Sequence, residues 1–360
     1  MEGQDRQGSR RKRLLLLTTD DPARPGGGRE MLSRLLHDLL AQLFEQVDTR
    51  RFTGSSRPID GLRGCLHGLD QSGQAALVQA VRSGGYDQVF IDGSNLGAAA
   101  MALRLAMPDL PITTFFHNCE TSFFMGALQA RPGPRALGVL LGNWRAERLA
   151  LRHSDTAIVL SERDSTRLRQ LCGRSGDAIL PLALADSWRP VAQPIERPAG
   201  YVLFVGGGFH GNLGGLEWFA RKIAPRLSVP TLAVGRGLEA LRDHLPESVE
   251  LVGGVDDLAP WYAGARLVVA PILAGSGMKT KVAEALMHGK RVIGTTEAFA
   301  GYGAGVLAAN RCVDEVEDFV GAIEVTLSAQ PLRFDPALRA LYEQDHSPTA
   351  ALTRLDAILR

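Results

Sequence analysis

The stretch PILAGSGMKTKVAEALMHGKRVIG, residues 271–294, decides how the rest of the sequence is interpreted. It follows the apolar run 267–270, which predicts a short buried strand. The glycine-rich turn Gly275-Ser276-Gly277 comes next, and then a helix that we expect to end at Gly289, because glycine is favoured just beyond a helix C-terminus. A second apolar run, 291–294, predicts another strand. This order of strand, turn, helix and strand is typical of a parallel sheet covered by helices.

Two lysines fall in the first turn of this predicted helix, where their charge is locally unfavourable. Lys279 and Lys281 lie at the end of the helix dipole that already carries partial positive charge. Two cations beside the free backbone N–H groups of a helix N-terminus make a good site for a diphosphate. Sequences often break local rules in this way at functional sites. The segment therefore predicts an anion site.

Glu284 lies three residues after Lys281, on the same face of the predicted helix. It either forms a helical ion pair with Lys281 or accepts hydrogen bonds from two hydroxyl groups, as from a ribose. Lys preceding Glu is the weaker order for a helical ion pair. The order therefore favours the second interpretation.

The alternation of strands and helices runs through two halves of the chain. Strands are predicted at 14–19, 88–91, 112–116 and 156–160, and again at 201–205, 231–234, 249–252, 267–270 and 291–294. Leucines at helical spacing predict a helix from Arg29 to Phe44, and Ser161 followed by Asp164 predicts a helix start. The segment from Thr53 to Gly85 is interpreted as a strand and a helix, and residues 351–359 as a last helix.

We therefore predict an α/β protein with two Rossmann-like domains. The expected domains are residues 1–185 and 199–335, joined by a proline-rich linker at 186–198. A helical segment, 336–360, is expected to pack on the first domain.

Composition excludes several classes of protein. The 360 residues have a formal net charge of +1, so no nucleic acid is expected as a partner. The four cysteines are too widely spaced for a zinc site or a redox dithiol, and we expect no metal and no cofactor. No apolar run is long enough for a signal peptide or a membrane span, which predicts a cytoplasmic protein. The basic run Arg10–Arg13 is interpreted as a disordered tail or as a peripheral contact with a membrane.

Three segments resemble the family-four, group 1 glycosyltransferases. GSGMKTKVAEALMHGKRVIGT, residues 275–295, is similar to their donor-binding segment. FVGGGFHGNLGGLEWF, residues 204–219, resembles the opening of their C-terminal domain, and VELVGGVDDLAPWYAGARLVVAP, residues 249–271, resembles the stretch between the two. The resemblance implies the GT-B fold, which is an α/β fold with two Rossmann-like domains facing each other across a cleft. It implies transfer of a sugar from a nucleotide-diphosphate donor on the second domain to a saccharide or lipid-linked acceptor on the first. It also implies retention of configuration, no metal ion, and a role in polysaccharide or glycolipid assembly.

The resemblance assigns roles to residues of this sequence. Lys279 and Lys281 would hold the donor diphosphate, and Glu284 would contact the ribose. His117 would face the sugar, and it joins the two lysines as a catalytic candidate. The glycine loops would lie beside the phosphates, and these further positions are Gly206, Gly207, Gly208, Ser276 and Gly277 for the donor, with Gly26, Gly27 and Gly28 for the acceptor and phosphate loop.

Two other functions remain open. Gly206 to Gly211 spell GxGxxG after a strand, which is also typical of an NAD(P)-dependent oxidoreductase, but the next strand ends at Gly235-Arg236 without the acidic residue that binds the ribose. Ser276 stands where many family members have a first glutamate, and this departure is the feature that favours a non-catalytic sugar-nucleotide-binding protein. Asn212 either caps the helix after this loop or lies in the donor loop.

Overall fold

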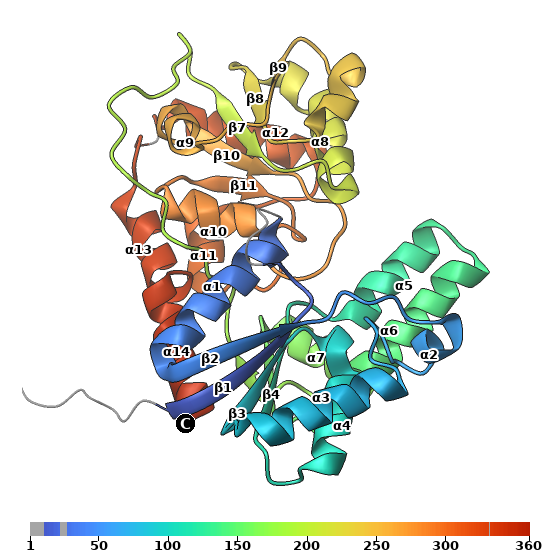
Figure 1. Cartoon of the computed structure of the whole chain (residues 1–360). Helices are drawn as coiled ribbons and strands as arrows, with labels where there is room; N and C mark the ends of the chain where they lie inside the picture. The colour runs from blue at the N-terminus through green and yellow to red at the C-terminus, as the bar shows by residue number, and fades with distance from the viewer. Residues whose placement is uncertain (1–10, 22–26, 331) are drawn as a thin grey trace, which may run out of the picture. The chain divides into compact units, whose positions relative to one another are not determined.

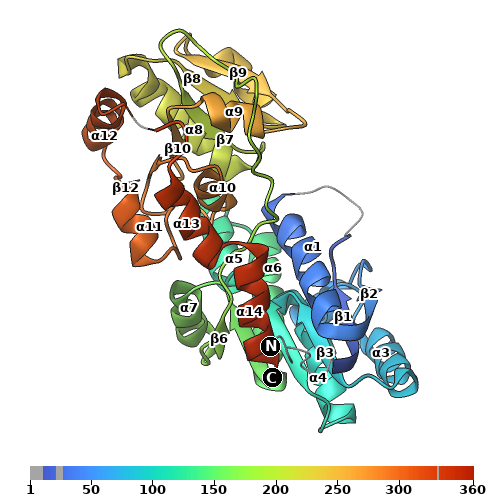
Figure 2. The ribbon, with the colours of Figure 1, turned by 90° about the vertical axis from the view of Figure 1, so that its left-hand side faces the viewer.

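The computed structural model describes residues 11–21, 27–330 and 332–360, which form two compact units. The first unit comprises the chain up to Pro181 together with Leu352–Arg360, and the second comprises Leu182–Ala351 (Figures 1 and 2). The sequence places the linker at 186–198, whereas residues from Leu182 onward already belong to the second unit. Most of the segment 336–360 also belongs to the second unit, and its last residues belong to the first.

The first unit is a parallel six-stranded sheet with flanking helices, in the strand order β2-β1-β3-β4-β5-β6. Its elements are β1 (Arg11–Thr18), α1 (Gly28–Leu43), β2 (Phe44–Arg51), α2 (Pro58–Leu62), α3 (Gln71–Gly84), β3 (Gln88–Asp92), the 3-10 helix η1 (Ser94–Leu96), α4 (Gly97–Ala106), β4 (Ile112–Phe116), α5 (Glu120–Ala130), α6 (Pro134–His153), β5 (Thr156–Val159), α7 (Glu162–Cys172) and β6 (Ala178–Ile179).

The second unit is also a parallel six-stranded sheet, in the order β12-β11-β10-β7-β8-β9. Its elements are β7 (Val202–Val205), α8 (His210–Lys222), η2 (Ala224–Arg226), β8 (Thr231–Val234), η3 (Leu238–His244), β9 (Val249–Gly253), α9 (Ala259–Gly264), β10 (Leu267–Ala270), α10 (Thr280–Met287), β11 (Val292–Gly294), α11 (Ala304–Ala309), β12 (Arg311–Cys312), α12 (Val316–Ser328) and α13 (Pro336–Asp345), and the chain ends with α14 (Pro348–Leu359), which spans the boundary between the units.

The central strands of both sheets are apolar on both faces, as is typical of parallel sheets covered by helices. In β1, Leu15 and Leu17 pack with α3 and α4, while Leu14 and Leu16, on the opposite face, are equally buried. In β7, Val202 and Phe204 pack against Phe219 of α8. The continuous apolar runs that predicted these strands are therefore explained by burial on two sides. None of the described helices combines the length and apolar composition needed to span a bilayer.

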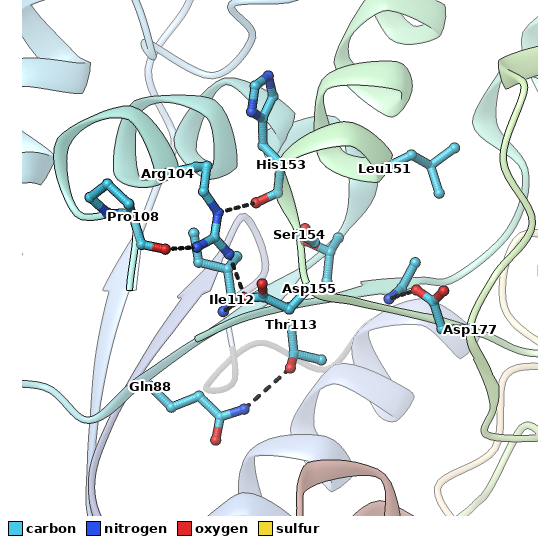
Figure 3. A network of polar contacts seen from close by, with 12 residues as sticks. Gln88, Arg104, Pro108, Ile112, Thr113, Leu151, His153, Ser154, Asp155 and Asp177 are labelled. Atoms are coloured by element: carbon cyan, nitrogen blue, oxygen red, sulfur yellow. Dashed lines mark hydrogen bonds and ion pairs between the residues drawn. The ribbon is translucent and has the colours of Figure 1, made fainter. Parts of the chain in front are cut away.

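A polar network joins the amino ends of the central strands in the first unit (Figure 3). Arg104 on α4 pairs with Asp155, which accepts a hydrogen bond from the backbone N–H of Ile112 at 2.7 Å. Arg104 also donates to the backbone oxygens of His153 and Pro108. These contacts fix the starts of β4 and β5. The carboxyl ends of the same strands are left for another set of polar residues.

The structure corrects two sequence-based expectations. The strand expected within 53–85 is absent from that described segment, which holds α2 and α3, and β2 lies earlier, directly after α1. The sequence did not predict β2, because this edge strand has mostly polar, partly exposed residues and no apolar run. The disordered tail predicted at the basic run is wrong for residues 11–13, which begin β1, and Arg13 pairs with Asp48 at 2.8 Å. Arg10 lies outside the described residues.

Gly97→Ala tests the close approach of α4 and α6 in the first unit. A Cβ on Gly97 would lie 1.9 Å from the backbone oxygen of Ala146, so the two helices would have to separate. We expect the free energy of unfolding to fall by about 1–3 kcal/mol, as for other overpacked sites. Gly138→Ala on α6 is the matched control, because a Cβ there meets no atom within 4 Å and gains helix propensity. Equal thermal unfolding of the two variants would contradict this account of the packing.

Candidate functional site

The second unit has a topological switch point between β7 and β10. From β7 the chain runs outward through β8 and β9 on one side, and β10 begins the other side of the sheet. Ligands of open parallel sheets bind in the crevice beyond the carboxyl ends of the strands at such a point. The loop 206–209 after β7 and the loop 271–279 after β10 both start there. Both glycine-rich segments predicted from the sequence therefore reach one edge of one sheet.

Glycines let the backbones of these loops touch. A Cβ on Gly208 would lie 2.6 Å from the backbone oxygen of Gly237, and one on Gly235 would lie 1.8 Å from that of Gly206. A Cβ on Gly215, in the helix after the loop, would lie 1.9 Å from the backbone oxygen of Pro271. Packing between neighbouring loops thus accounts for much of the glycine content, whether or not a dinucleotide binds.

Lys281 is buried at the N-terminus of α10. Its side chain donates a hydrogen bond from Nζ to Oδ1 of Asn212 at 2.9 Å, and Nζ lies 4.5 Å from the centre of the Phe204 ring. The residue is 7% exposed. Burial lowers the pKa of the Lys281 amine to about 7, with a further lowering by Lys279, and nearby Glu284 opposes both. An amine with this pKa is poised to gain a proton when an anion arrives.

Asn212 connects Lys281 to the glycine loop. Its Nδ2 donates to the backbone oxygen of Gly207 at 3.0 Å, while its Oδ1 accepts from Lys281. The helix-cap interpretation of Asn212 is wrong, because α8 begins at His210 and Asn212 lies inside its first turn. The asparagine therefore fixes the position of the amine relative to the loop. Its place in a glycine-rich loop was the only sequence signal for this role.

Lys279 is the N-cap residue of α10 and points into the turn that precedes it. Its Nζ donates to the backbone oxygens of Gly277 at 2.8 Å and Ser276 at 3.3 Å, and it pairs with Glu297 at 2.9 Å. Gly277 has φ of +63°, a conformation that favours glycine. In this structure Lys279 thus stabilises the turn that carries Ser276. Glu297 is a site residue that the sequence did not indicate.

Glu284 contacts Tyr262. The Tyr262 hydroxyl donates to Oε2 of Glu284 at 2.9 Å. Within the described residues no ion pair joins Glu284 to Lys281, so the helical ion pair is not the arrangement found. Burial raises the pKa of the Glu284 carboxyl, and the Tyr262 hydrogen bond and the charge of Lys281 partly offset that rise. Tyr262 comes from α9, so its contact with α10 had no local sequence signal.

The site candidates of the first unit lie beside β3 and β4. His117 follows β4 and contacts Oδ1 of Asp92, at the end of β3, through Nε2 at 2.6 Å. Burial works to raise the pKa of the Asp92 carboxyl, but His117, Ser33 and Arg29 outweigh it and lower that pKa to about 2. Nδ1 of His117 is buried without a hydrogen-bond partner among the described residues. It is thus the one ring nitrogen left for a ligand.

The predicted N-terminal glycine loop is partly described. Gly27 is the N-cap residue of α1, and Gly28 is the first residue of that helix. Gly26 lies outside the described residues. The two described glycines therefore stand at a helix N-terminus, which is a favourable place for an anion.

Asp20, Asp92 and His117 offer ligand atoms within 4.8 Å of one another, close enough for a metal ion. Their atoms are already engaged, however. Asp92 accepts from Thr18 and Ser33 as well as contacting His117, and Asp20 pairs with Arg29 at 3.1 Å. The guanidinium of Arg29 thus provides positive charge to this cluster. The prediction of no metal ion stays a prediction.

Comparison with known proteins agrees with this geometry. Residues 199–328 match the family model described as glycosyl transferases group 1. A search of curated proteins finds no match. The sucrose-phosphate synthase of Thermosynechococcus elongatus is similar in structure with a TM-score of 0.72, 18% identity and 98% of each chain covered. HepE of Anabaena, solved with UDP, has a TM-score of 0.65 at 18% identity, covering 96% of this chain and 99% of that one.

The two parallel sheets and these structural neighbours define a protein of the GT-B fold. The second unit contains residues 199–328, which match the group 1 glycosyl transferase model, and both units together have the GT-B fold of the solved neighbours. The predicted fold class is confirmed, and the predicted family is supported over residues 199–328. The individual roles of the site residues stay predictions.

Lys281→Met tests whether the buried amine serves binding rather than stability. The folded chain holds the amine at a pKa of about 7 against an ordinary value of 10.5, so the unfolded chain binds more protons between those pH values. Wild-type stability therefore rises with pH across that window. Methionine fills similar space without a charge, so we expect a melting temperature at pH 7 at or above wild type, with the difference shrinking towards pH 10. Nucleotide binding should be lost. A variant that melts well below wild type, or that binds nucleotide normally, would contradict this assignment.

Proposed function

We propose that the chain transfers a sugar from a nucleotide-diphosphate sugar, bound on the second unit, to a saccharide or lipid-linked acceptor bound on the first. The observation that carries the proposal is the buried Lys281 amine, held by Asn212 against the Gly206–Gly208 loop at a helix N-terminus. Glu284 lies on the same helix. A cation, backbone N–H groups and a carboxylate in this order suit a diphosphate followed by a ribose.

Solved neighbours support a nucleotide-sugar donor. HepE of Anabaena is described in complex with UDP-glucose, with a TM-score of 0.61. WaaB is described as a lipopolysaccharide outer core galactosyltransferase, with a TM-score of 0.63. By this analogy we extend the proposal to polysaccharide or glycolipid assembly in the cytoplasm.

The chemistry needs negative charge to be stabilised on the departing nucleotide diphosphate. A preorganised cation and helix dipole supply this stabilisation well, because they need little reorganisation during reaction. Protonation of Lys281 on donor binding would place a full positive charge beside the phosphates. We therefore propose a metal-independent reaction. Retention of configuration follows from the family resemblance alone.

The oxidoreductase alternative is weakened by the end of β8. A dinucleotide-binding domain needs an acidic residue there for the ribose. The chain instead has Gly235 and the exposed Arg236, which pairs with Asp256 at 3.4 Å. An arginine suits the 2′-phosphate of NADP, so the alternative is kept as an outcome of the test below.

The alternative of a non-catalytic binding protein rests on Ser276. Detectable hydrolysis of the nucleotide sugar would exclude it.

A thermal-shift screen with UDP, GDP, ADP, NAD and NADP tests the proposal, because a ligand that binds the folded state raises its melting temperature. We expect stabilisation by one nucleoside diphosphate in the wild type and none in Lys281→Met. Hydrolysis of the matching nucleotide sugar should then be detectable and should persist in EDTA. Stabilisation by NADP alone would favour the oxidoreductase. Binding without turnover would favour the non-catalytic protein, and loss of turnover in EDTA would refute metal independence.

We also propose that the first unit touches the inner face of a membrane through α5, α6 and their connection. Between Thr121 and Ala146 the sequence has three arginines and no acidic residue. Large apolar side chains are exposed on the same two helices, and these are Met125, Leu137, Val139 and Leu141. Arginine beside exposed apolar side chains suits an anionic lipid surface. This segment replaces the basic run Arg10–Arg13 as the region to test.

Leu137→Glu with Leu141→Glu should abolish co-sedimentation with vesicles that contain phosphatidylglycerol, because charge would replace apolar surface at the interface. Wild type should bind these vesicles and not pure phosphatidylcholine, since each arginine near an anionic surface contributes about 1 kcal/mol. Val325→Glu is the control, because Val325 is 69% exposed on α12 of the other unit. If the control loses binding equally, or wild type ignores both vesicles, the proposed contact fails.

A further inference from the structure

Two parts of the Tyr262 side chain, its ring and its hydroxyl, each contact another residue of the second unit. Its ring lies parallel to that of His288, with an interplanar angle of 3° and centroids 4.4 Å apart. Its hydroxyl donates to Oε2 of Glu284. The side chain is fully buried. The tyrosine therefore links α9 to the middle of α10, where Glu284 lies, and to the C-terminal end of that helix, where His288 is the C-cap residue.

We infer that Tyr262 is a positioning residue that orients the Glu284 carboxylate and so sets a preference for ribose over deoxyribose in the bound nucleotide. The inference rests on the proposed function, in which Glu284 meets the ribose hydroxyls. Under this inference Tyr262, which lies on α9 and outside the α10 segment, contributes to recognition of the ribose.

The geometry of the carboxylate supports this role. A carboxylate rotates easily about its terminal torsion, and two vicinal hydroxyls require both of its oxygens in a fixed plane. Tyr262 anchors Oε2, and among the described residues no hydrogen bond engages Oε1. Oε1 and the second lone pair of Oε2 therefore stay in one fixed plane, where they can accept hydrogen bonds from two neighbouring hydroxyl groups. Without the tyrosine hydroxyl, the plane of the group would be free to turn.

The charge of the carboxylate supports it as well. Only the ionised form accepts hydrogen bonds from two hydroxyls through both oxygens. Burial raises the pKa of Glu284, and the Tyr262 hydroxyl and Lys281 work in the opposite direction. Removing the hydroxyl would move this pKa further upward. Nucleotide binding, which needs the ionised form, would then be lost at a higher pH as the solution is acidified.

The test compares affinities for UDP and 2′-deoxy-UDP, with the ADP and GDP pairs in parallel, in wild type and Tyr262→Phe. A hydrogen bond to a charged group supports a wild-type preference of about tenfold for the ribose form. In Tyr262→Phe we expect that preference to fall below about threefold, mainly through weaker binding of the ribose form. As the pH is lowered, the affinity for the nucleotide should also begin to fall at a higher pH in Tyr262→Phe than in wild type.

Tyr201→Phe is the matched control. Tyr201 is also fully buried in the second unit, and its hydroxyl donates to the backbone oxygen of Trp261 at 2.6 Å, next to Tyr262. This variant loses a comparable hydrogen bond and should lose comparable stability, yet it should keep the ribose preference. The inference is overturned if both variants lose the preference equally, if Tyr262→Phe keeps it, or if wild type has none. Failure of wild type to bind any of the six nucleotides would instead refute the proposed function itself.

Discussion

The burial of the Lys281 amine constrains everything around it at the N-terminus of α10. A lysine placed there meets the positive end of a helix dipole and loses most of its water, and both effects disfavour its charge. The surrounding structure compensates only in part. Asn212 accepts a hydrogen bond from the amine, and the face of the Phe204 ring lies beside it. Glu284 is a nearby opposite charge. The balance leaves the pKa of the amine at about 7, so an incoming anion would supply the opposite charge that the surrounding residues provide only in part.

That arrangement depends on backbones that approach one another without side chains between them. The loop after β7 touches the loop after β8 through Gly206, Gly208, Gly235 and Gly237, and α8 touches the loop after β10 through Gly215. Asn212 is carried on this rigid base, and through it the amine is fixed relative to Gly207. The glycine-rich sequence thus has a packing cause that is separate from any ligand. A GxGxxG pattern in such a loop is therefore weak support for a dinucleotide.

The parts of this structure that the sequence predicted are the parts that local rules control. The strands 112–116, 231–234 and 267–270 have the predicted ends, because each is an apolar run buried on two sides. Gly289 ends α10 with φ of +60°, and Ser161 caps α7 by accepting from the N–H of Asp164. Lys281 and Glu284 were candidates because a lysine in the first turn opposes the helix dipole and because Lys before Glu is the weaker order for an ion pair. The contacts of Tyr262, Glu297 and Asn212 were beyond prediction, since each joins elements distant in sequence.

The two units place opposite chemistry at the same edge of similar sheets. In the second unit the carboxyl edge carries a buried cation whose pKa is lowered, which suits an anion that arrives from solvent. In the first unit the carboxyl edge carries a buried anion, Asp92, whose pKa is held near 2 by His117, Ser33 and Arg29. A permanently charged carboxylate fixes Nε2 of His117 and leaves Nδ1 as the ring's remaining polar atom. The first unit is thus arranged to hold one imidazole in one orientation, with Nδ1 available to contact a hydroxyl-bearing group. The two units therefore differ in the sign of the buried charge at this edge, and this difference is compatible with the donor site that we propose on the second unit.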